Sequence, residues 1–271
     1  MTLRTIRWTV VSLAAPLALA ARPATAQTDY YNTDVGRPLQ TEDAYAIERR
    51  AVEIQAAPLR LERSRNVYVW GIEPELAVGL LPRTQLELGV PLLVIDAGAA
   101  GRSAGVAGLD ASILYNLNAE TRIPALAVAA GVLAPLGSLA RDEAYASVKG
   151  IATKTLPWAR FHLNYQYTFG DARSDDVVGA GAAELARWTA GLAVDRAFPL
   201  ESLLLSAEVF TQRPLVAGEA LEWNAAAGTR VQLTPRLALD LGSGAHLTGD
   251  DRGWFATVGG AWVIGLPWRA R

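Results

Sequence analysis

The chain has 271 residues, 51% of them hydrophobic, a formal net charge of −2 and no cysteine. The lack of cysteine excludes disulfides, thiolate metal sites and a lipoprotein anchor, and no basic patch is present to bind nucleic acid. The longest apolar stretch, residues 124–135, is broken by Gly131 and is too short for a membrane helix. High apolar content without such a helix is typical of a β-barrel, in which lipid-facing and lumen-facing residues alternate.

Residues 1–26 have the pattern of a cleaved secretory signal. Arg4 and Arg7 precede an apolar core at residues 10–20, and Ala24-Thr25-Ala26 forms an A-x-A cleavage site. The alternative, a membrane anchor, is less favoured because the apolar core is too short to span a bilayer. We therefore expect an exported protein in a Gram-negative-type bacterium with an outer membrane.

The next segment, residues 27–50, is polar and irregular, with Gly36, Pro38 and several acids. It is predicted to be a periplasmic lead-in or a partial plug. A transmembrane β-barrel is expected at 51–265, followed by a C-terminal tail at 266–271.

Residues 161–169 show the pattern that defines the rest of the chain, with apolar odd positions and polar even positions. Successive side chains of a strand point to opposite faces, so this segment has one apolar and one polar face. Its repetition predicts an all-β fold, a transmembrane antiparallel up-and-down β-barrel of about twelve strands. The expected strands are 51–61, 67–80, 84–94, 106–117, 123–134, 144–155, 159–170, 187–198, 201–212, 220–232, 235–246 and 253–265.

Two kinds of connection alternate between these strands. One kind is short and usually contains proline, which presets φ and donates no ladder hydrogen bond; the other is longer and rich in Gly, Asp, Ser and Ala. This alternation predicts short periplasmic turns and longer external loops. The short turns lie at 81–84, 118–121, 156–158, 198–200 and 234–236, and the longer loops at 96–105, 137–143, 171–186, 213–219 and 247–253.

Aromatic residues fall at the ends of the expected strands, as they do at both interfaces of membrane barrels. One group lies at the external ends, namely Tyr68, Trp70, Trp188, Trp223 and Trp254, and another at the periplasmic ends, namely Trp158, Phe198, Trp262 and Trp268.

The last strand contains the spacing Thr257-x-Gly259-x-x-Trp262-x-Ile264, which is similar to the assembly signal of outer-membrane barrels. It differs in ending seven residues before the C-terminus, with Ile264 in place of an aromatic residue. We expect the barrel assembly machinery, outer-membrane lipid and lipopolysaccharide as partners.

The same alternation predicts which side chains face the lumen. Charged side chains facing lipid at mid-membrane are costly, so they are assigned to the inner face. Acids outnumber bases there, which predicts a preference for cations or neutral solutes over anions if the lumen is open. The inward candidates are Glu73, Glu75, Glu87, Asp110, Arg160, His162, Asn164, Gln166, Asp195, Glu208, Glu222, Asn224, Arg230, Arg236 and Asp240.

Strand number leaves the state of the lumen open. Barrels of about eight strands are filled by side chains, whereas those of 16–18 strands enclose a wide channel. With twelve strands, both an open narrow pore and a plugged or gated lumen are possible.

No residues form a recognisable catalytic or cofactor site. His162 and His246 are both predicted to face inward, but about eight residues apart along their strands, ~26 Å, which is too far to share a metal ion. A phospholipase-like site is disfavoured because His162 faces inward without a serine partner on the lipid-facing wall. Neither an enzyme nor a cofactor is therefore expected.

The expected loop at 171–186 contains two short patterns. Asp171, Asp175, Asp176 and Glu184 suggest either a hard-cation site bridging lipopolysaccharide phosphates or a solvated loop. Gly179-Ala180-Gly181 resembles the start of a dinucleotide fingerprint but lacks its third glycine, so we interpret it as loop.

Four segments carry a family resemblance: GRPLQTEDAYAIER (36–49), GIEPELAVGLLPRTQLELGVPL (71–92), GLDASILYNL (108–117) and HLNYQYTFG (162–170). They resemble the outer-membrane β-barrel family labelled "transporter, meta-pathway of phenol degradation". The resemblance implies a channel, with small aromatic or hydrophobic compounds as its suggested solutes, and it supplies no catalytic residues.

Three functional hypotheses follow. The first is an outer-membrane channel for passive uptake or efflux of small solutes. The second is a closed-lumen structural or surface-interaction barrel without transport. The third is a soluble periplasmic β protein, which would need no detergent for extraction.

Overall fold

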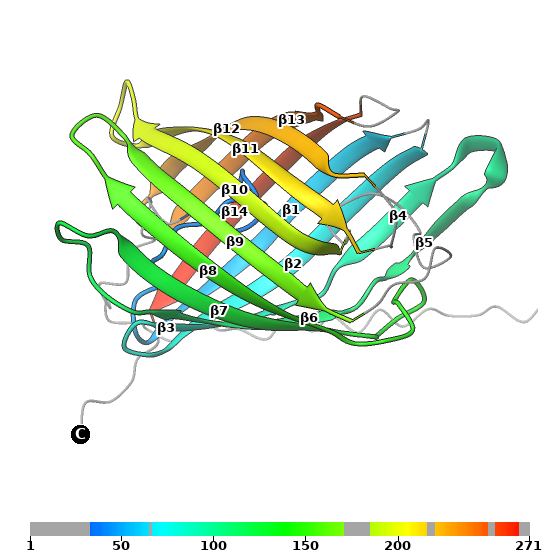
Figure 1. Cartoon of the computed structure of the whole chain (residues 1–271), viewed down its shortest axis with the longest axis horizontal. Coiled ribbons are helices and arrows are strands. Elements are labelled where there is room, and N and C mark those ends of the chain that lie inside the picture. Colours follow the sequence, from blue (N-terminus) through cyan, green and yellow to red (C-terminus); the bar gives the residue numbers. More distant parts are fainter. Residues whose placement is uncertain (1–32, 65–66, 171–184, 216–219, 249–252, 266–271) are drawn as a thin grey trace, which may run out of the picture.

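The computed structural model describes residues 33–64, 67–170, 185–215, 220–248 and 253–265. Its strands form one antiparallel sheet, which closes on itself because β1 pairs with both β2 and β14. The strands are tilted and wrap around a common axis (Figure 1). Their bounds are β1 Ala51–Ser64, β2 Val67–Leu81, β3 Thr84–Gly89, β4 Leu92–Asp96, β5 Arg102–Val106, β6 Leu109–Asn116, β7 Ala125–Ala134, β8 Tyr145–Thr155, β9 Arg160–Phe169, β10 Ala186–Ala197, β11 Leu203–Pro214, β12 Glu222–Thr234, β13 Leu237–His246 and β14 Trp254–Gly265.

These fourteen strands make a twelve-stranded barrel wall, because β3 with β4, and β5 with β6, each form one interrupted wall strand. β2 pairs first with β4 and then with β3, and β3 pairs with β6. The break between β3 and β4 lies at Val90 and Pro91, where proline cannot donate to a ladder. The predicted all-β, up-and-down barrel of about twelve strands is confirmed.

The predicted loop at 96–105 was wrong in extent. β4 and β5 form a hairpin from Leu92 opposite Val106 to Asp96 opposite Arg102, and it projects from one end of the barrel (Figure 1). Residues 102–106 include Ser103, Ala104 and Gly105, small residues of the kind that are common in loops. Pairing with β4 nevertheless supplies partners for their backbone groups, which local composition alone does not reveal.

β1 contains a register shift, and the positions whose side chains face inward change from odd to even across it. Ladder pairing shifts between Gln55 and Leu59, with one more residue on β1 than on either neighbour. Such a bulge makes the residues on its two sides alternate out of phase. Glu53 and Gln55 are therefore buried at odd positions, whereas Arg60 and Glu62 are buried at even positions.

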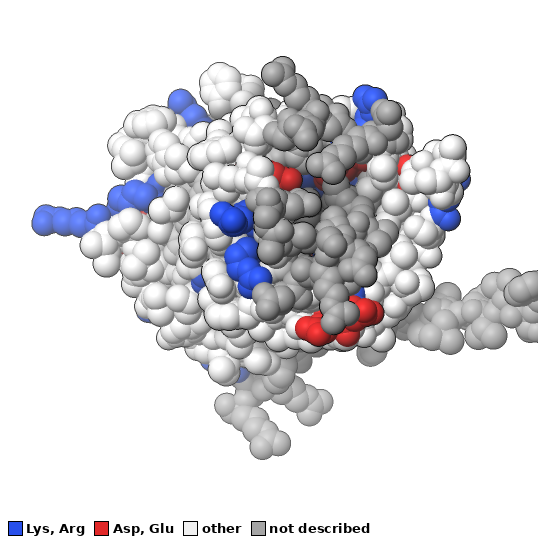
Figure 2. Space-filling view, turned by 45° about the vertical axis from the view of Figure 1, so that its right-hand side comes forward, with Lys and Arg blue, Asp and Glu red and all other residues white. Residues whose placement is uncertain are grey.

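The outer surface of the wall is largely apolar. Outward side chains of successive strands are exposed leucines, valines and aromatics. On the face drawn in Figure 2, the described surface is mostly uncharged, and Lys, Arg, Asp and Glu form small groups. Exposed aromatics lie at both ends, including Tyr68 and Trp223 at one and Trp158 and Trp262 at the other. Trp188 is partly buried. Trp268 lies outside the described residues.

We call the two ends of the barrel by their connections. The short-turn end carries the β2–β3, β8–β9 and β12–β13 turns together with the start of β1, and the long-loop end carries the β4–β5 hairpin and the β7–β8 connection. In the part of the chain that the structure describes, no helix is long and apolar enough to cross a membrane.

Candidate functional site

Residues 33–50, here called the lumen segment, lie inside the barrel. Arg37, Leu39 and Ala44 are almost completely buried. The segment first forms a closed loop, in which Thr33 N–H donates to the Asp43 carboxylate and Asp43 N–H donates to the Thr33 carbonyl, at 3.1 Å each. It then descends to the start of β1 at the short-turn end, where Arg50 N–H donates to the carbonyl of Gly79.

Side chains of the wall satisfy the backbone of this irregular segment. Buried N–H groups need partners, and here no strand ladder supplies them. The Glu208 carboxylate accepts from Gln40 N–H and Thr41 N–H at 2.8 and 2.9 Å. Further along, Thr153 accepts from Ala44 N–H at 3.0 Å and Gln85 accepts from Ile47 N–H at 2.7 Å. Inward polar residues on opposite sides of the barrel thus hold one segment.

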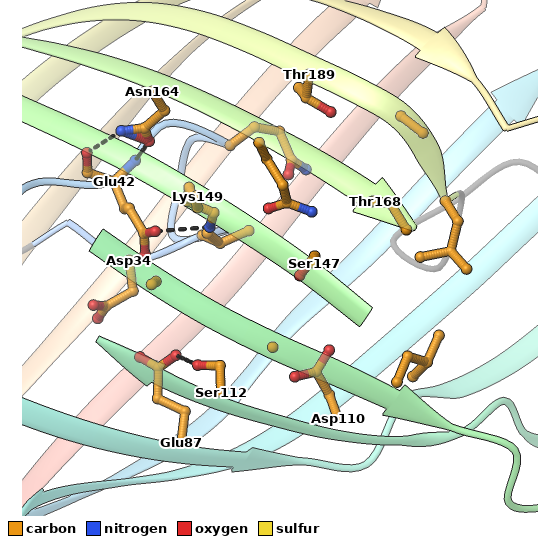
Figure 3. Close-up of a pocket in the computed structure, with 18 of the residues that line it drawn as sticks. Asp34, Glu42, Glu87, Asp110, Ser112, Ser147, Lys149, Asn164, Thr168 and Thr189 are labelled. Carbon is orange, nitrogen blue, oxygen red and sulfur yellow. Dashed lines mark hydrogen bonds and ion pairs between the residues drawn. The ribbon is translucent and has the colours of Figure 1, made fainter. Parts of the chain in front are cut away.

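Glu42 is the point where the lumen segment meets β8 and β9. Its carboxylate lies 2.7 Å from Lys149 Nζ, and its backbone exchanges two hydrogen bonds with the Asn164 side chain at 2.7 and 2.9 Å (Figure 3). Both wall residues are therefore committed to the segment. A charge-assisted bond with partly buried partners is stronger than a neutral one.

Arg37 holds the other side of the loop against β1 and β13. Its guanidinium pairs with Asp34, with Glu53 at 2.8 Å and, more distantly, with Asp240 at 3.9 Å. Arg230 donates to the Arg37 carbonyl at 3.3 Å and also pairs with Asp240. Every charge in this buried group has an opposite charge beside it, as the interior of a protein requires.

A second paired group lies on β8, β9 and β10. Arg160 donates to both oxygens of Asp195, at 2.9 and 2.7 Å. His162 lies between Asp195 and Thr153, 3.0 Å from each. Because Thr153 also accepts from the lumen segment, this group connects the wall network to the segment.

His246 lies in a separate group near the long-loop end. Its ring nitrogens lie 2.5 Å from Asn224 Oδ1 and 3.3 Å from Glu62, which also pairs with Arg60. Arg60 stacks over the Phe255 ring at 3.8 Å. The two histidines therefore have different partners.

Tyr45 anchors the lumen segment at the short-turn end. Its hydroxyl donates to Glu120 at 3.2 Å. Burial, and then the negative charge of Glu120, raise the pKa of Tyr45 to about 12. Deprotonation would place two negative charges side by side, so the hydrogen bond persists to strongly alkaline pH.

A cavity of about 270 Å³ remains above the lumen segment, toward the long-loop end. Glu42, Asp34 and Thr41 of the segment form part of its lining, and the walls come from β2, β3 and β6 through β11. Figure 3 shows Glu87 and Asp110 reaching into it from one side, opposite the strands that carry Lys149 and Asn164. The segment therefore divides the lumen into a filled part and a hollow part.

Four carboxylates on adjacent strands line one side of this cavity, and we call them the acidic wall: Glu73, Glu75, Glu87 and Asp110. Glu87 accepts from Ser112 at 2.6 Å and from Gln85, both neutral donors. Among the described residues, Glu73, Glu75 and Asp110 have no hydrogen-bond or ion-pair partner. This wall differs from the other inward carboxylates, most of which contact a cation or backbone N–H groups.

The inward candidates from the sequence fall into three sets. Glu73, Glu75, Glu87, Asp110 and Gln166 line the cavity, and Asn164 lies at the boundary. A second set meets the lumen segment or its buried ion pairs, namely Arg160, His162, Asp195, Glu208, Arg230 and Asp240. The third lies toward the barrel ends, where Glu222 bonds Gln212, Asn224 bonds His246, and Arg236 is exposed in the β12–β13 turn. The inward prediction for Arg236 was therefore wrong, because the strand ends before it.

Sequence reasoning missed several inward residues. Glu53, Gln55, Arg60 and Glu62 were hidden by the phase reversal of β1, although Pro58 marked an irregularity there. Lys149 was obscured because Lys154, at opposite parity in the same strand, confused the alternation. Lys154 instead lies at the short-turn end, where it pairs with Glu120.

The acidic loop residues Asp171, Asp175, Asp176 and Glu184, and the Gly179-Ala180-Gly181 pattern, lie outside the described residues. No group of three or more His, Asp or Glu side chains able to hold a metal ion occurs in the part of the chain that the structure describes.

Comparison with known proteins places the architecture among solved barrels. No family model matches the chain, and no curated protein matches it. An outer membrane channel from Pseudomonas putida F1 is 15% identical, with 86% of this chain and 100% of that chain covered at a TM-score of 0.59. The KdgM porin (10% identical, TM-score 0.51) and the NanC porin (7% identical, TM-score 0.52) each cover 78% of this chain and 98% of their own. At these identities the likeness shows the fold alone.

Proposed function

We propose that this protein is an outer-membrane channel for the passive passage of small solutes. The observation that carries the proposal is the cavity within a closed barrel whose outer surface is apolar and whose interior is polar. An apolar outer surface suits lipid, and a polar lumen suits water and solutes. The secretory signal expected at residues 1–26 and the aromatic residues at both ends support an outer-membrane location, with the short-turn end in the periplasm.

We further propose that the lumen segment acts as the constriction. It occupies the lumen between the cavity and the short-turn end, and wall side chains from several strands hold it. A solute entering the cavity from the long-loop end would meet Asp34, Thr41 and Glu42 before it could go further. Passage would require the segment to shift or the solute to pass beside it.

Charge in the cavity favours cations or neutral solutes over anions. The acidic wall contributes four carboxylates, and Lys149 is already paired with Glu42. The family resemblance suggests small aromatic or hydrophobic compounds, and such solutes would need a polar or charged group to replace water on these walls.

Conductance in planar lipid bilayers and solute-specific liposome swelling test the channel. We expect small discrete conductance steps, with a reversal potential that indicates cation preference, and faster swelling with neutral solutes of low mass. A barrel that shows heat-modifiable migration, and is therefore folded, but gives neither conductance nor swelling would contradict the proposal.

A closed structural barrel is the second candidate. The observation that favours it is the number of wall side chains committed to the lumen segment, including Glu208, Asn164 and Thr153. This candidate predicts silent bilayers for the intact protein and conductance only when the segment is removed. The two candidates therefore differ in the behaviour of the unaltered chain.

A further inference from the structure

One side of the cavity is lined by neutral residues. β9, β10 and β11 contribute no charged side chain to the lining, whereas β2, β3 and β6 carry the acidic wall. The cation on the neighbouring strand β8, Lys149, is paired with Glu42. We give the name neutral wall to four polar residues on this side of the cavity: Ser147 of β8, Gln166 and Thr168 of β9, and Thr189 of β10.

Ladder pairing places these four side chains next to one another. Ser147 pairs with Thr168 across β8 and β9, and Gln166 pairs with Thr189 across β9 and β10. Gln166 and Thr168 lie two residues apart on β9, so they face the same side. Paired strands lie about 4.8 Å apart and alternate residues about 6.6 Å apart, which lets one small molecule contact all four side chains. Figure 3 shows Thr168 and Thr189 across the cavity from Glu87.

None of these four side chains has a hydrogen-bond partner among the described residues. Thr168 is 1% exposed, and its hydroxyl is a buried polar atom without a partner. Its backbone carbonyl accepts from Arg187 at 3.2 Å, so only the side chain is unsatisfied. By contrast, the inward amides of Asn164 and Gln85 both bond the lumen segment. Buried polar groups normally have a partner, so the neutral wall indicates a polar molecule in the cavity.

The lumen segment forms a floor beside the neutral wall. Thr41 lies over Gly191, which is two residues beyond Thr189 on β10. A Cβ at Gly191 would lie 2.5 Å from the Thr41 hydroxyl oxygen, so the absence of a side chain there lets the segment approach. Gln40 and Thr41 both line the cavity, and Glu208 accepts from their backbone N–H groups. A solute at the neutral wall therefore meets a floor that is held in place.

The chemistry of the neutral wall favours uncharged solutes with several hydroxyl groups. Serine and threonine hydroxyls and glutamine amides both donate and accept hydrogen bonds, as the hydroxyls of a polyol do. A cationic solute gains little at Thr168, because Asp110 of the acidic wall lies three strand spacings away, about 14 Å or more along the sheet. The cavity of about 270 Å³ is smaller than the roughly 300–1,000 Å³ of sites for drug-sized ligands, which favours a small solute.

We propose that the neutral wall binds small polyols, with a linear four-carbon polyol as the best-fitting class. Hydroxyls at the two ends of such a chain can reach Gln166 and Thr168, and the hydroxyls between them can reach Thr189. The carbon chain would lie along β9, beside the floor formed by Thr41. The proposal names a solute class for the proposed channel and rests on that function, although binding can be measured in a barrel that does not conduct.

Saturation-transfer difference NMR of the folded, detergent-solubilised full chain tests this site with probes of equal chain length. Erythritol carries four hydroxyls, 1,4-butanediol two hydroxyls and putrescine two positive charges, and micelles without protein give the background. We expect saturable binding of erythritol, with a dissociation constant at least fivefold lower than that of 1,4-butanediol, because more hydroxyls find partners. Equal dissociation constants would overturn the proposal. Displacement of erythritol by one tenth of its concentration of putrescine would also overturn it, because the cavity would then be a cation site.

Three variants locate the site. Thr168→Val combined with Thr189→Val removes two hydroxyls and keeps the shape of each side chain, and it should raise the dissociation constant of erythritol at least fivefold. Gln166→Met, at a half-buried position, should also weaken binding, and it repeats the test if the double variant does not fold. Thr121→Val, an exposed change in the β6–β7 connection, should leave binding unchanged. Unaltered affinity in the first two variants, with heat-modifiable migration retained, would overturn the assignment.

Conductance distinguishes a failure of this site from a failure of the channel. Erythritol binding in a protein that is silent in planar bilayers supports the site and overturns the channel function. Conductance without erythritol binding supports the channel function and overturns the site.

Discussion

The two parts of the lumen have walls of similar polarity, but the carboxylates are paired with cations or backbone N–H groups in one part and form no ion pair in the other. Around the lumen segment, Arg37, Arg160 and Arg230 each contact carboxylates, and Glu208 receives backbone N–H groups. Around the cavity, no carboxylate of the acidic wall forms an ion pair within 4 Å among the described residues, and Lys149, the cation that lines the same cavity, is paired with Glu42. Inward polar residues therefore have two roles in this barrel. One set holds the lumen segment, and the other lines the cavity, where a solute can reach it.

The largest expected effect, on conductance, comes from removing the lumen segment that fills one part of the lumen. Replacing residues 33–46 by a Gly-Ser linker of equal length would leave Ile47 to Arg50 in place and empty the filled part of the lumen. We expect single-channel conductance to rise several-fold, because the constriction is lost. Heat-modifiable migration checks that the barrel still folds, and an unchanged conductance would show that the segment is not the constriction.

Breaking one ion pair in the filled part should destabilise the fold. Arg37→Ala leaves Asp34 and Glu53 buried without their cation, which costs about 3–5 kcal/mol in comparable sites. Urea unfolding in micelles, followed by tryptophan fluorescence, measures the loss. Arg49→Ala, at an exposed position of the same segment, is the matched control and should change the free energy of unfolding little. Equal effects of the two changes would refute the contrast in charge balance.

Removing a charge in the hollow part should stabilise the fold, whereas Arg37→Ala in the filled part should destabilise it. Glu73→Gln relieves repulsion from Asp110 and Glu87, and we expect it to increase the free energy of unfolding by about 1 kcal/mol. The same urea experiment measures it, with Glu201→Gln, an exposed change in the β10–β11 turn, as the control. A clear destabilisation would mean that Glu73 has a favourable partner in the folded protein.

The smallest effect is a pH dependence at the short-turn end. The pKa of Tyr45 is raised from 10.0 to about 12 in the folded state. Because folding raises the pKa, the stabilisation from the hydrogen bond between the Tyr45 hydroxyl and Glu120 is present below pH 10 and is lost as the pH rises toward 12. Ultraviolet titration at alkaline pH should show one late-titrating tyrosine that disappears in Tyr45→Phe. A titration curve unchanged by that substitution would contradict the assignment.

Strand number and facing were predictable because side chains in a strand alternate with a period of two. Trp70, Ile72 and Leu76 are exposed on the outer surface, with Glu73 and Glu75 on the other face, as the alternation indicated. The prediction failed where that period was interrupted. The bulge in β1 reversed the phase for Arg60 and Glu62, and the β4–β5 hairpin used residues whose composition resembles a loop.

The sequence by itself determined the barrel, its number of strands and the polarity of its two faces, since these depend on local alternation and on the turn residues. Only the tertiary structure decided what the inward residues contact. Glu208 is 168 residues from Gln40 in the chain, and Arg230 is 193 residues from Arg37. Contacts across a closed sheet depend on register and on the path of an irregular segment, and neither has a periodic signal in the sequence. For the same reason, parity alone could not distinguish the carboxylates that hold the segment from those that face the cavity.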